Sequence, residues 1–208
     1  MILNSEEIKN LKIIESFDEK KFRNASYDLS IDKIITMDGK ERASGYKIKS
    51  QEMIWVICKE KFNMPMDVIG FAHMYTHRTR EGILSMNTGI IDPGYEGKIS
   101  TLLINFGKGE QSILKNSVLL RVTFADINNK NNELKPSRII MDDDTYWGII
   151  QESTKNFDKT FLNMETVYTK LYGFLLKSVV RVIVILAAIA SIIGLLLLIL
   201  ELIKKIPH

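Results

Sequence analysis

The sequence predicts an all-β domain, followed by an amphipathic helix and one C-terminal transmembrane helix. Three observations support this prediction. Apolar residues alternate with a period of two between Asn24 and Ile127, a heptad-like pattern follows over residues 153–178, and the 19 residues from Val182 to Leu200 carry no charge. The whole chain has 46% hydrophobic and 25% charged residues, as in an ordinary globular protein. About 150 residues remain to fold in water, enough for one hydrophobic core.

Charge and cysteine content exclude several classes of protein. The formal net charge is only +3, so the charge balance does not indicate a surface that binds nucleic acid. The single cysteine, Cys58, forms no intramolecular disulfide, and its apolar neighbours favour a buried small side chain over a nucleophile. Residues 1–23 form an N-terminal segment in which Glu6–Glu15 has the spacing of a short helix. No basic stretch precedes an apolar one there, so we expect no signal peptide.

Residues 24–127 form the predicted β domain. In Ser117–Phe124 apolar residues occupy every second position, as in a half-buried strand, and Gln51–Cys58 and Lys98–Phe106 are also apolar and β-branched. Turn signals separate the strands at Asp38-Gly39, Asn63–Pro65, Asp92-Pro93-Gly94 and Gly107-Lys108-Gly109. Many short strands with turns between them indicate a β-sandwich or barrel.

Residues 128–152 are expected to form a polar linker, with an exposed loop over Asn128–Ser137. We interpret the three aspartates at 142–144 as a solvated loop rather than a magnesium cluster. His73 and His77 are four residues apart on a predicted strand, but the sequence offers them no third ligand. We therefore favour ordinary strand histidines and expect no metal site.

Residues 153–178 have the pattern of an amphipathic helix. Apolar or small side chains follow the a and d positions of a short coiled coil at Phe161, Met164, Tyr168, Leu171, Leu175 and Ser178. Gly173 weakens this helix by about 1 kcal/mol. Two alternatives remain: the helix packs on its own domain, or it lies on a bilayer.

Residues 179–203 are predicted to be a single-pass C-terminal membrane anchor. The uncharged run within it gives about 28 Å of helix, close to the hydrocarbon thickness of a bilayer. Lysines flank both ends, so the positive charges do not decide its orientation. Because no N-terminal signal is expected, we place the soluble domain in the cytoplasm. The alternative is a buried helix of a soluble protein.

Four segments in the β domain, taken in order, carry a family resemblance. They are Asn24–Ser30, Phe62–Gly70 with the following Thr76–Gly82, Gly89–Gly97 with its Asp-Pro-Gly turn, and Asn116–Phe124. Together they resemble the superfamily of dCTP deaminases and trimeric dUTP pyrophosphatases (dUTPases), and the Asp-Pro-Gly turn is the deaminase-like version. The resemblance covers about residues 24–125. It implies a dUTPase-like distorted jelly-roll barrel and a homotrimer with sites between subunits.

The resemblance also implies a site for a deoxynucleoside triphosphate, dCTP or dUTP. Asp92 stands where the dUTPase aspartate orients the attacking water, which makes it the candidate catalytic residue. Tyr95 stands where an aromatic ring contacts the sugar. The residues expected to bind the nucleotide are Thr76, Arg78, Arg80, Tyr95 and Arg121. Magnesium is the one cofactor that we expect, bound with the nucleotide.

Plain structural roles compete with these assignments. Asp92 would cap a tight turn, Tyr95 would pack in the barrel, and Arg78 and Arg80 would be solvated charges at a strand end. The sequence also departs from the family pattern. Ten residues after Asp92, where the deaminases carry a proton-shuttling glutamate, stands Leu102, which transfers no proton. The glycine-rich C-terminal arm that closes the dUTPase site is absent from this chain's sequence.

Three functions are consistent with this pattern. The preferred one is a membrane-anchored, trimeric deoxynucleoside-triphosphate-binding protein in which catalysis is reduced or lost. The second is an active dCTP deaminase or dUTP pyrophosphatase tethered to the membrane. The third is a membrane protein without turnover, either a nucleotide-gated effector of the kind used in phage defence or a plain scaffold.

Overall fold

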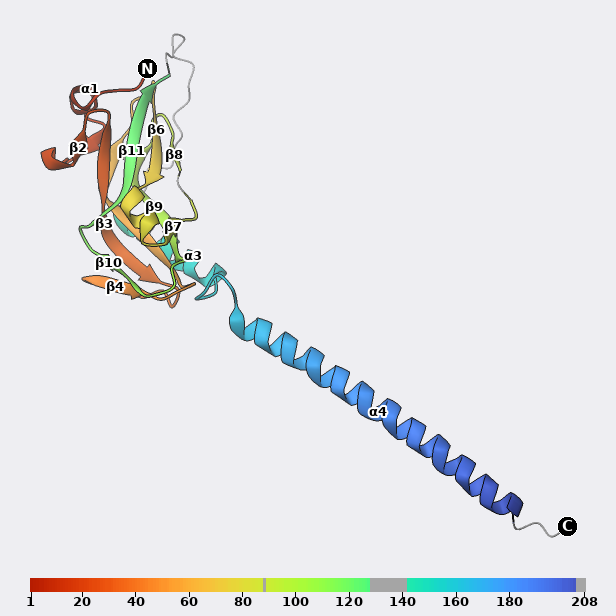
Figure 1. Ribbon diagram of the computed structural model, residues 1–208. Helices are drawn as coiled ribbons and strands as arrows, with labels where there is room; N and C mark the ends of the chain where they lie inside the picture. The colour runs from red at the N-terminus through yellow and green to blue at the C-terminus, as the bar shows by residue number, and fades with distance from the viewer. Residues whose placement is uncertain (88, 128–141, 205–208) are drawn as a thin grey trace. The chain divides into compact units, whose positions relative to one another are not determined.

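The computed structural model describes residues 1–87, 89–127 and 142–204. The chain divides into two compact units, Met1–Leu162 and a second unit that begins at Asn163 (Figure 1). The first unit contains all the strands and the second a single long helix, so each unit is described by itself.

One large antiparallel sheet forms the first unit and curls into a half-barrel (Figure 1). Its strand order is β7-β9-β5-β3-β11-β6-β8, with β1 beside β5 and β2 beside β3. The strands are β1 (Ile14–Glu15), β2 (Phe22–Arg23), β3 (Ser26–Thr36), β5 (Met53–Asn63), β6 (Val68–Met74), β7 (Ile83–Ser85), β8 (Ile90–Ile91), β9 (Glu96–Asn105) and β11 (Val118–Asp126). A second sheet pairs β4 (Gly45–Ile48) with β10 (Gln111–Leu114). The predicted all-β barrel followed by an apolar helix is confirmed.

Strand β5 is buried on both faces, which explains its almost continuous apolar sequence. Ile54, Val56 and Cys58 point into the main core, and Trp55 and Ile57 point to the opposite face. Burial raises the pKa of the Cys58 thiol far above its ordinary value. Cys58 is therefore a packed side chain rather than a nucleophile, as its neighbours in the sequence predict.

The loop between β8 and β9 is a tight turn. Gly94 has a φ of +72°, and the Tyr95 amide donates to the Asp92 carbonyl at 3.1 Å. Proline at the second position and a glycine of positive φ at the third are the requirements of a type II turn. Asn116 also has a positive φ, +64°. Asparagine tolerates this conformation, so it can stand where the resembling family usually has glycine.

Two short helical segments precede β2. Helix α1 (Ser5–Asn10) begins at the cap residue Asn4, whose side chain accepts from the Glu7 amide while the Glu7 carboxylate accepts from the Asn4 amide. It lies within the Glu6–Glu15 stretch that has helical spacing, but ends earlier. A 3₁₀ turn, η1, follows at Glu19–Lys21.

Helix α3 (Asp143–Ser153) lies within the segment that we expected to be a linker through residue 152. The Asp142 side chain caps its N-terminus, and the Asp143 carboxylate lies 2.9 Å from Lys98 Nζ, so this acidic run is not a solvated loop. Ile150 packs against Ile35 and Ile57 on the outer face of the sheet. That apolar face needs a cover, and α3 supplies it. The predicted loop at residues 128–137 lies outside the described residues.

The second unit is helix α4 (Met164–Lys204), 41 residues long. It runs without interruption across the boundary expected at residue 178, but it begins later than residue 153. A 3₁₀ turn, η2 (Thr154–Asn156), and an extended segment come first. Phe161 therefore lies outside the heptad pattern and contacts Phe106 in the first unit, with ring centroids 5.5 Å apart.

One stretch of α4 is long and apolar enough to cross a membrane. It lies within the 34 residues Thr166–Ile199, where an 18-residue window has a mean hydropathy of 3.3. The large apolar side chains from Val179 to Ile199 are exposed along the helix rather than packed in a core.

Candidate functional site

A cavity of about 510 Å³ opens in the first unit beside the β8–β9 turn. Asp92 and Tyr95 line it from the turn, Ser100 from β9, Trp55 from β5 and Tyr146 from α3. We call it the turn cavity. Its volume lies within the range of small-molecule binding sites, and its walls combine apolar side chains with a few polar groups, as such sites do.

Asp92 is the first residue of the turn and is exposed at the cavity wall. It is the only carboxylate among the described residues that line this cavity. A carboxylate in this position can orient a water molecule or accept its proton. The type II turn fixes the backbone of Asp92 relative to Tyr95, which follows three residues later.

Tyr95 presents its ring to the cavity and its hydroxyl to the protein. The hydroxyl donates to the Lys98 carbonyl, and the ring packs against the main core. Burial raises the pKa of Tyr95 well above its ordinary value of 10.0. The phenol therefore stays neutral, and the part of Tyr95 available to a ligand is the apolar ring. An apolar ring at this place suits contact with a sugar.

Helix α3 forms a wall that the sequence did not predict. The Tyr146 hydroxyl donates to Ser100 Oγ at 2.8 Å, and burial raises the pKa of Tyr146. Ile150, one turn further along α3, also lines the cavity. The helical spacing of Tyr146, Trp147 and Ile150 after the capping Asp142 was the signal available in the sequence. It is too short to stand out against the polar residues around it.

Trp55 completes the wall from the outer face of β5. Its Nε1 atom is buried and has no hydrogen-bond partner among the described residues. A buried indole N–H normally finds an acceptor, because leaving the donor unpaired costs about 1–3 kcal/mol. The unpaired donor belongs to a residue that lines the turn cavity.

The predicted phosphate-binding residues on helix α2 (Thr76–Arg80) do not line the turn cavity. Thr76 is exposed at the first position of α2. Arg78 is committed to the protein: its guanidinium donates to Ser117 Oγ at 2.7 Å and to a Glu81 carboxylate oxygen at 3.0 Å. Arg80 is exposed and has no ion pair with another described residue. Arg80 is thus the arginine of α2 that is available to an anion.

Arg121 on β11 is held by a buried carboxylate. Its Nε donates to Asp28 Oδ1 at 2.6 Å, and Arg23 lies 2.9 Å from Asp28 Oδ2. The hydrogen bond that Arg121 donates to Asp28 raises the pKa of Arg121. The guanidinium also lies 5.3 Å from the ring of Tyr75, the residue before α2. Arg23 and Arg121 both pair with Asp28, so this group of three side chains keeps a net charge of about +1.

The structure thus separates the predicted site residues into two groups. Asp92 and Tyr95 share the turn cavity. Thr76, Arg78 and Arg80 lie on α2, and Arg121 lies beside its start. No described side chain of the second group reaches the lining of the turn cavity within one chain.

Leu102 lies outside the cavity lining. Its side chain is 4% exposed and packs with Met53 and Ile104 on the outer face of the sheet. His73 lies on β6 and His77 on α2, with His77 Nε2 3.4 Å from Glu81. Among residues 1–87, 89–127 and 142–204, no group of three or more His, Cys, Asp or Glu side chains is placed to hold a metal ion.

The β domain is similar in sequence to known proteins. Residues 33–127 match the family model described as dCTP deaminase-like. The dCTP deaminase of Pyrococcus abyssi is 25% identical over 128 residues, covering 60% of this chain and 82% of the relative. That of Pyrococcus horikoshii is 29% identical over 109 residues, covering 50% and 69%.

The similarity extends to the fold. The crystal structure of the 2'-deoxycytidine 5'-triphosphate deaminase from Agrobacterium tumefaciens superimposes with a TM-score of 0.51 at 16% identity. The match covers 59% of this chain and 48% of that chain, so this chain spans about half the length of the solved protein. By sequence match and by fold, the β domain of this chain is similar to dCTP deaminases.

Proposed function

We propose that this chain is a membrane-attached protein that binds a deoxynucleoside triphosphate, dCTP or dUTP, with catalysis reduced or lost. The observation that carries the proposal is the turn cavity, in which Asp92 and Tyr95 lie together in a dCTP deaminase-like domain. The ring of Tyr95 suits the sugar, and the remaining apolar wall suits a flat base. These contacts come from a single chain.

The phosphates need cations that the turn cavity does not contain. Arg80 is the available candidate on α2, and Arg121 with Arg23 adds positive charge beside the start of that helix. In a homotrimer the α2 of one subunit would lie beside the turn cavity of the next, as the family resemblance implies. The separation of the two residue groups within one chain supports this arrangement. Light scattering of the detergent-solubilised chain tests it, and a monomer at working concentration would contradict it.

Magnesium would enter with the nucleotide. The described residues offer no cluster of carboxylates or histidines for a protein-held ion. Magnesium binds through phosphate oxygens and waters in many nucleotide sites, and it neutralises phosphate charge. We therefore expect the ion to be held by the triphosphate rather than by the protein.

The proposed loss of catalysis rests on the residue at the family's glutamate position. The family's glutamate position carries Leu102, which is buried away from the lining. Deamination therefore lacks its proton carrier here. An active enzyme stays the second candidate because Asp92 is present in the cavity and can activate water. Hydrolysis at a phosphate would need only the activation of water by Asp92 and a cation that stabilises the leaving phosphate.

The site assignment is tested by two substitutions, Arg80→Ala and Asp92→Asn. Arg80→Ala removes the cation proposed to bind the phosphates, and Asp92→Asn removes the carboxylate of the turn cavity. We expect each to weaken triphosphate affinity about tenfold. Isothermal titration calorimetry of the full chain in detergent measures the change. Lys108→Ala and Asp67→Asn are matched controls, because both side chains are exposed and lie outside the turn cavity. Unchanged affinity in both test variants would refute the assignment.

The membrane role rests on α4. Its span Thr166–Ile199 is long and apolar enough to cross a bilayer, and its large side chains are exposed. We expect the chain to float with phospholipid vesicles after an alkaline wash. Replacing Ile192 and Leu196 together by lysine should abolish flotation, since each charge at the centre of a span costs about 3 kcal/mol. Flotation that survives both lysines would exclude α4 as the anchor.

A further inference from the structure

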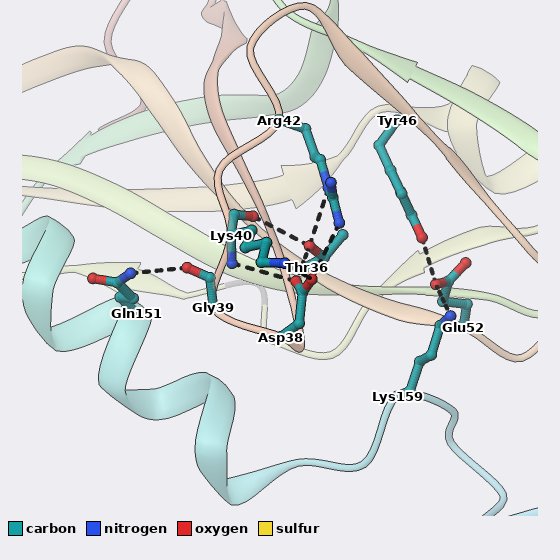
Figure 2. A network of polar contacts seen from close by, with 9 residues as sticks. All are labelled: Thr36, Asp38, Gly39, Lys40, Arg42, Tyr46, Glu52, Gln151 and Lys159. Atoms are coloured by element: carbon teal, nitrogen blue, oxygen red, sulfur yellow. Dashed lines mark hydrogen bonds and ion pairs between the residues drawn. The ribbon is translucent and has the colours of Figure 1, made fainter.

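Helix α3 is held on the sheet by polar contacts near both ends and by apolar packing of Tyr146, Trp147 and Ile150 between them. Lys98 Nζ lies 2.9 Å from Asp143 at the start of the helix, and Gln151 Nε2 donates to the Gly39 carbonyl at 2.8 Å near its end (Figure 2). Ile150 is the one buried apolar side chain among its residues. A single helix of 11 residues can separate from a sheet at a lower free energy than that of global unfolding, so a ligand that contacts the helix can shift this local equilibrium.

The turn cavity touches this helix directly. Tyr146 lines the cavity, and its hydroxyl is oriented by the hydrogen bond to Ser100. Trp55 lines the same cavity and carries the unpaired buried Nε1 donor. A ligand that accepts a hydrogen bond from Trp55 and packs on Tyr146 would bind only when α3 is docked.

Trp55 also contacts the segment after α3. Its ring meets that of Phe157 edge to face, with centroids 6.1 Å apart. Residues 157–162, which we call the exit segment, then run along the start of β5. The Met53 amide donates to the Lys159 carbonyl at 2.9 Å, and Phe161 contacts Phe106. One aromatic side chain therefore faces both the cavity and the exit segment.

A buried carboxylate fixes the exit segment at its middle. Glu52 is 1% exposed, accepts a hydrogen bond from the Tyr46 hydroxyl at 2.6 Å and lies 3.6 Å from Lys159 Nζ (Figure 2). Thr160 forms a β-bridge with Glu52. The exit segment is thus packed on the barrel up to Leu162, and α4 begins two residues later.

We propose that Trp55 and Tyr146 contact the ligand of the turn cavity, and that its binding stabilises the docked state of α3 and of the exit segment. The inference rests on the proposed function, because it takes the ligand to be a deoxynucleoside triphosphate. Binding and docking are then linked, so each favours the other by the same factor. The cavity becomes a sensor whose state reaches the chain that enters α4.

Hydrogen exchange of the full chain in detergent, with and without dCTP or dUTP, tests the linkage. We expect saturating nucleotide to slow amide exchange at least threefold in α3 and in the exit segment. Trp55→Phe keeps the aromatic packing but removes the Nε1 donor, and Tyr146→Phe removes the hydroxyl. Each should weaken nucleotide affinity about fivefold to tenfold. Unchanged affinity in both would overturn the ligand contact.

Phe157→Ala separates ligand contact from transmission. It removes the ring that meets Trp55 but does not line the turn cavity. Nucleotide should still slow exchange in α3 and should no longer slow it in the exit segment. Lys155→Ala is the matched control, since this side chain is 71% exposed and its ion pair with Glu152 lies in solvent. We expect the wild-type exchange pattern in the control.

The outcomes distinguish this inference from the proposed function. Nucleotide that binds the wild-type chain without slowing exchange in either segment overturns the inference and leaves nucleotide binding in place. Failure of the wild-type chain to bind either nucleotide overturns both. Slowed exchange in the exit segment of Phe157→Ala would contradict the role given to the Trp55–Phe157 contact.

Discussion

Lys98 joins two carboxylates that belong to different parts of the first unit. Its Nζ lies 2.9 Å from Asp32 on β3 and 2.9 Å from Asp143 on α3, while Lys115 adds a contact of 3.4 Å to Asp32. Burial acts to raise the pKa of Asp32, but the hydrogen bond and charge of Lys98, with Lys115, outweigh it and hold this pKa below 3.8. Lys98 therefore ties α3 to the barrel through charge.

Asp32→Asn tests this ionic network. A carboxyl whose pKa is lowered by folding stabilises the folded state above its unfolded pKa and loses that contribution as the pH falls through the folded value. We expect the substitution to lower the free energy of unfolding by about 2 kcal/mol at pH 7. The difference from the wild-type chain should shrink below about pH 4. Urea unfolding at pH 7 and pH 3 measures both, and an equal difference at the two pH values would contradict the account.

Single residues also show what the sequence can and cannot predict about the site. Asp92 and Tyr95 were predicted from a local motif, and the turn that holds them is itself local, so the structure keeps them together. Arg78 and Arg121 have the expected residue type, but their guanidiniums are bound to Ser117 and to Asp28. Those partners come from distant strands, which no spacing in the sequence reveals.

Among the elements, α3 has the clearest energetic test. Ile150 is 6% exposed against Ile35 and Ile57, whereas its neighbour Ile149 is 44% exposed. Ile150→Ala should lower the free energy of unfolding by about 2–4 kcal/mol, because it leaves a cavity under the helix. Ile149→Ala, the matched control, should change it by less than about 0.5 kcal/mol. Equal effects measured by urea unfolding would mean that α3 does not dock through Ile150.

Elements differ in how well their sequence predicts them. The strands β5, β9 and β11 follow from alternation and apolar runs, since a strand buried on one or both faces needs that pattern. The sequence does not predict helix α3 in the same way. Only one of its residues, Ile150, is buried, so its apolar pattern is weak, and the helix is stabilised by packing on the outer face of the sheet. The start of α4 was placed too early because Phe161 fits the heptad spacing, yet it packs on the barrel instead.

At the scale of the whole molecule, the described residues combine a domain that is similar to dCTP deaminases with the long apolar helix α4. Between them lie α3 and the exit segment, both of which pack on the strand that lines the turn cavity. A plain tether needs no such packing. This arrangement favours the proposal that the state of the cavity matters to the chain that enters α4.

The measurement that tests the central claim most directly is nucleotide binding by the full chain in detergent or vesicles. Thermal stabilisation and product formation are followed in the same samples with dCTP, dUTP and dTTP, each with magnesium. Stabilisation by dCTP or dUTP without product is the predicted result, and a ligand at one hundred times its Kd should add about 2.7 kcal/mol of stability. Turnover would make the protein an enzyme whose catalytic group lies at a position other than 102. No stabilisation by any of the three nucleotides would contradict the account.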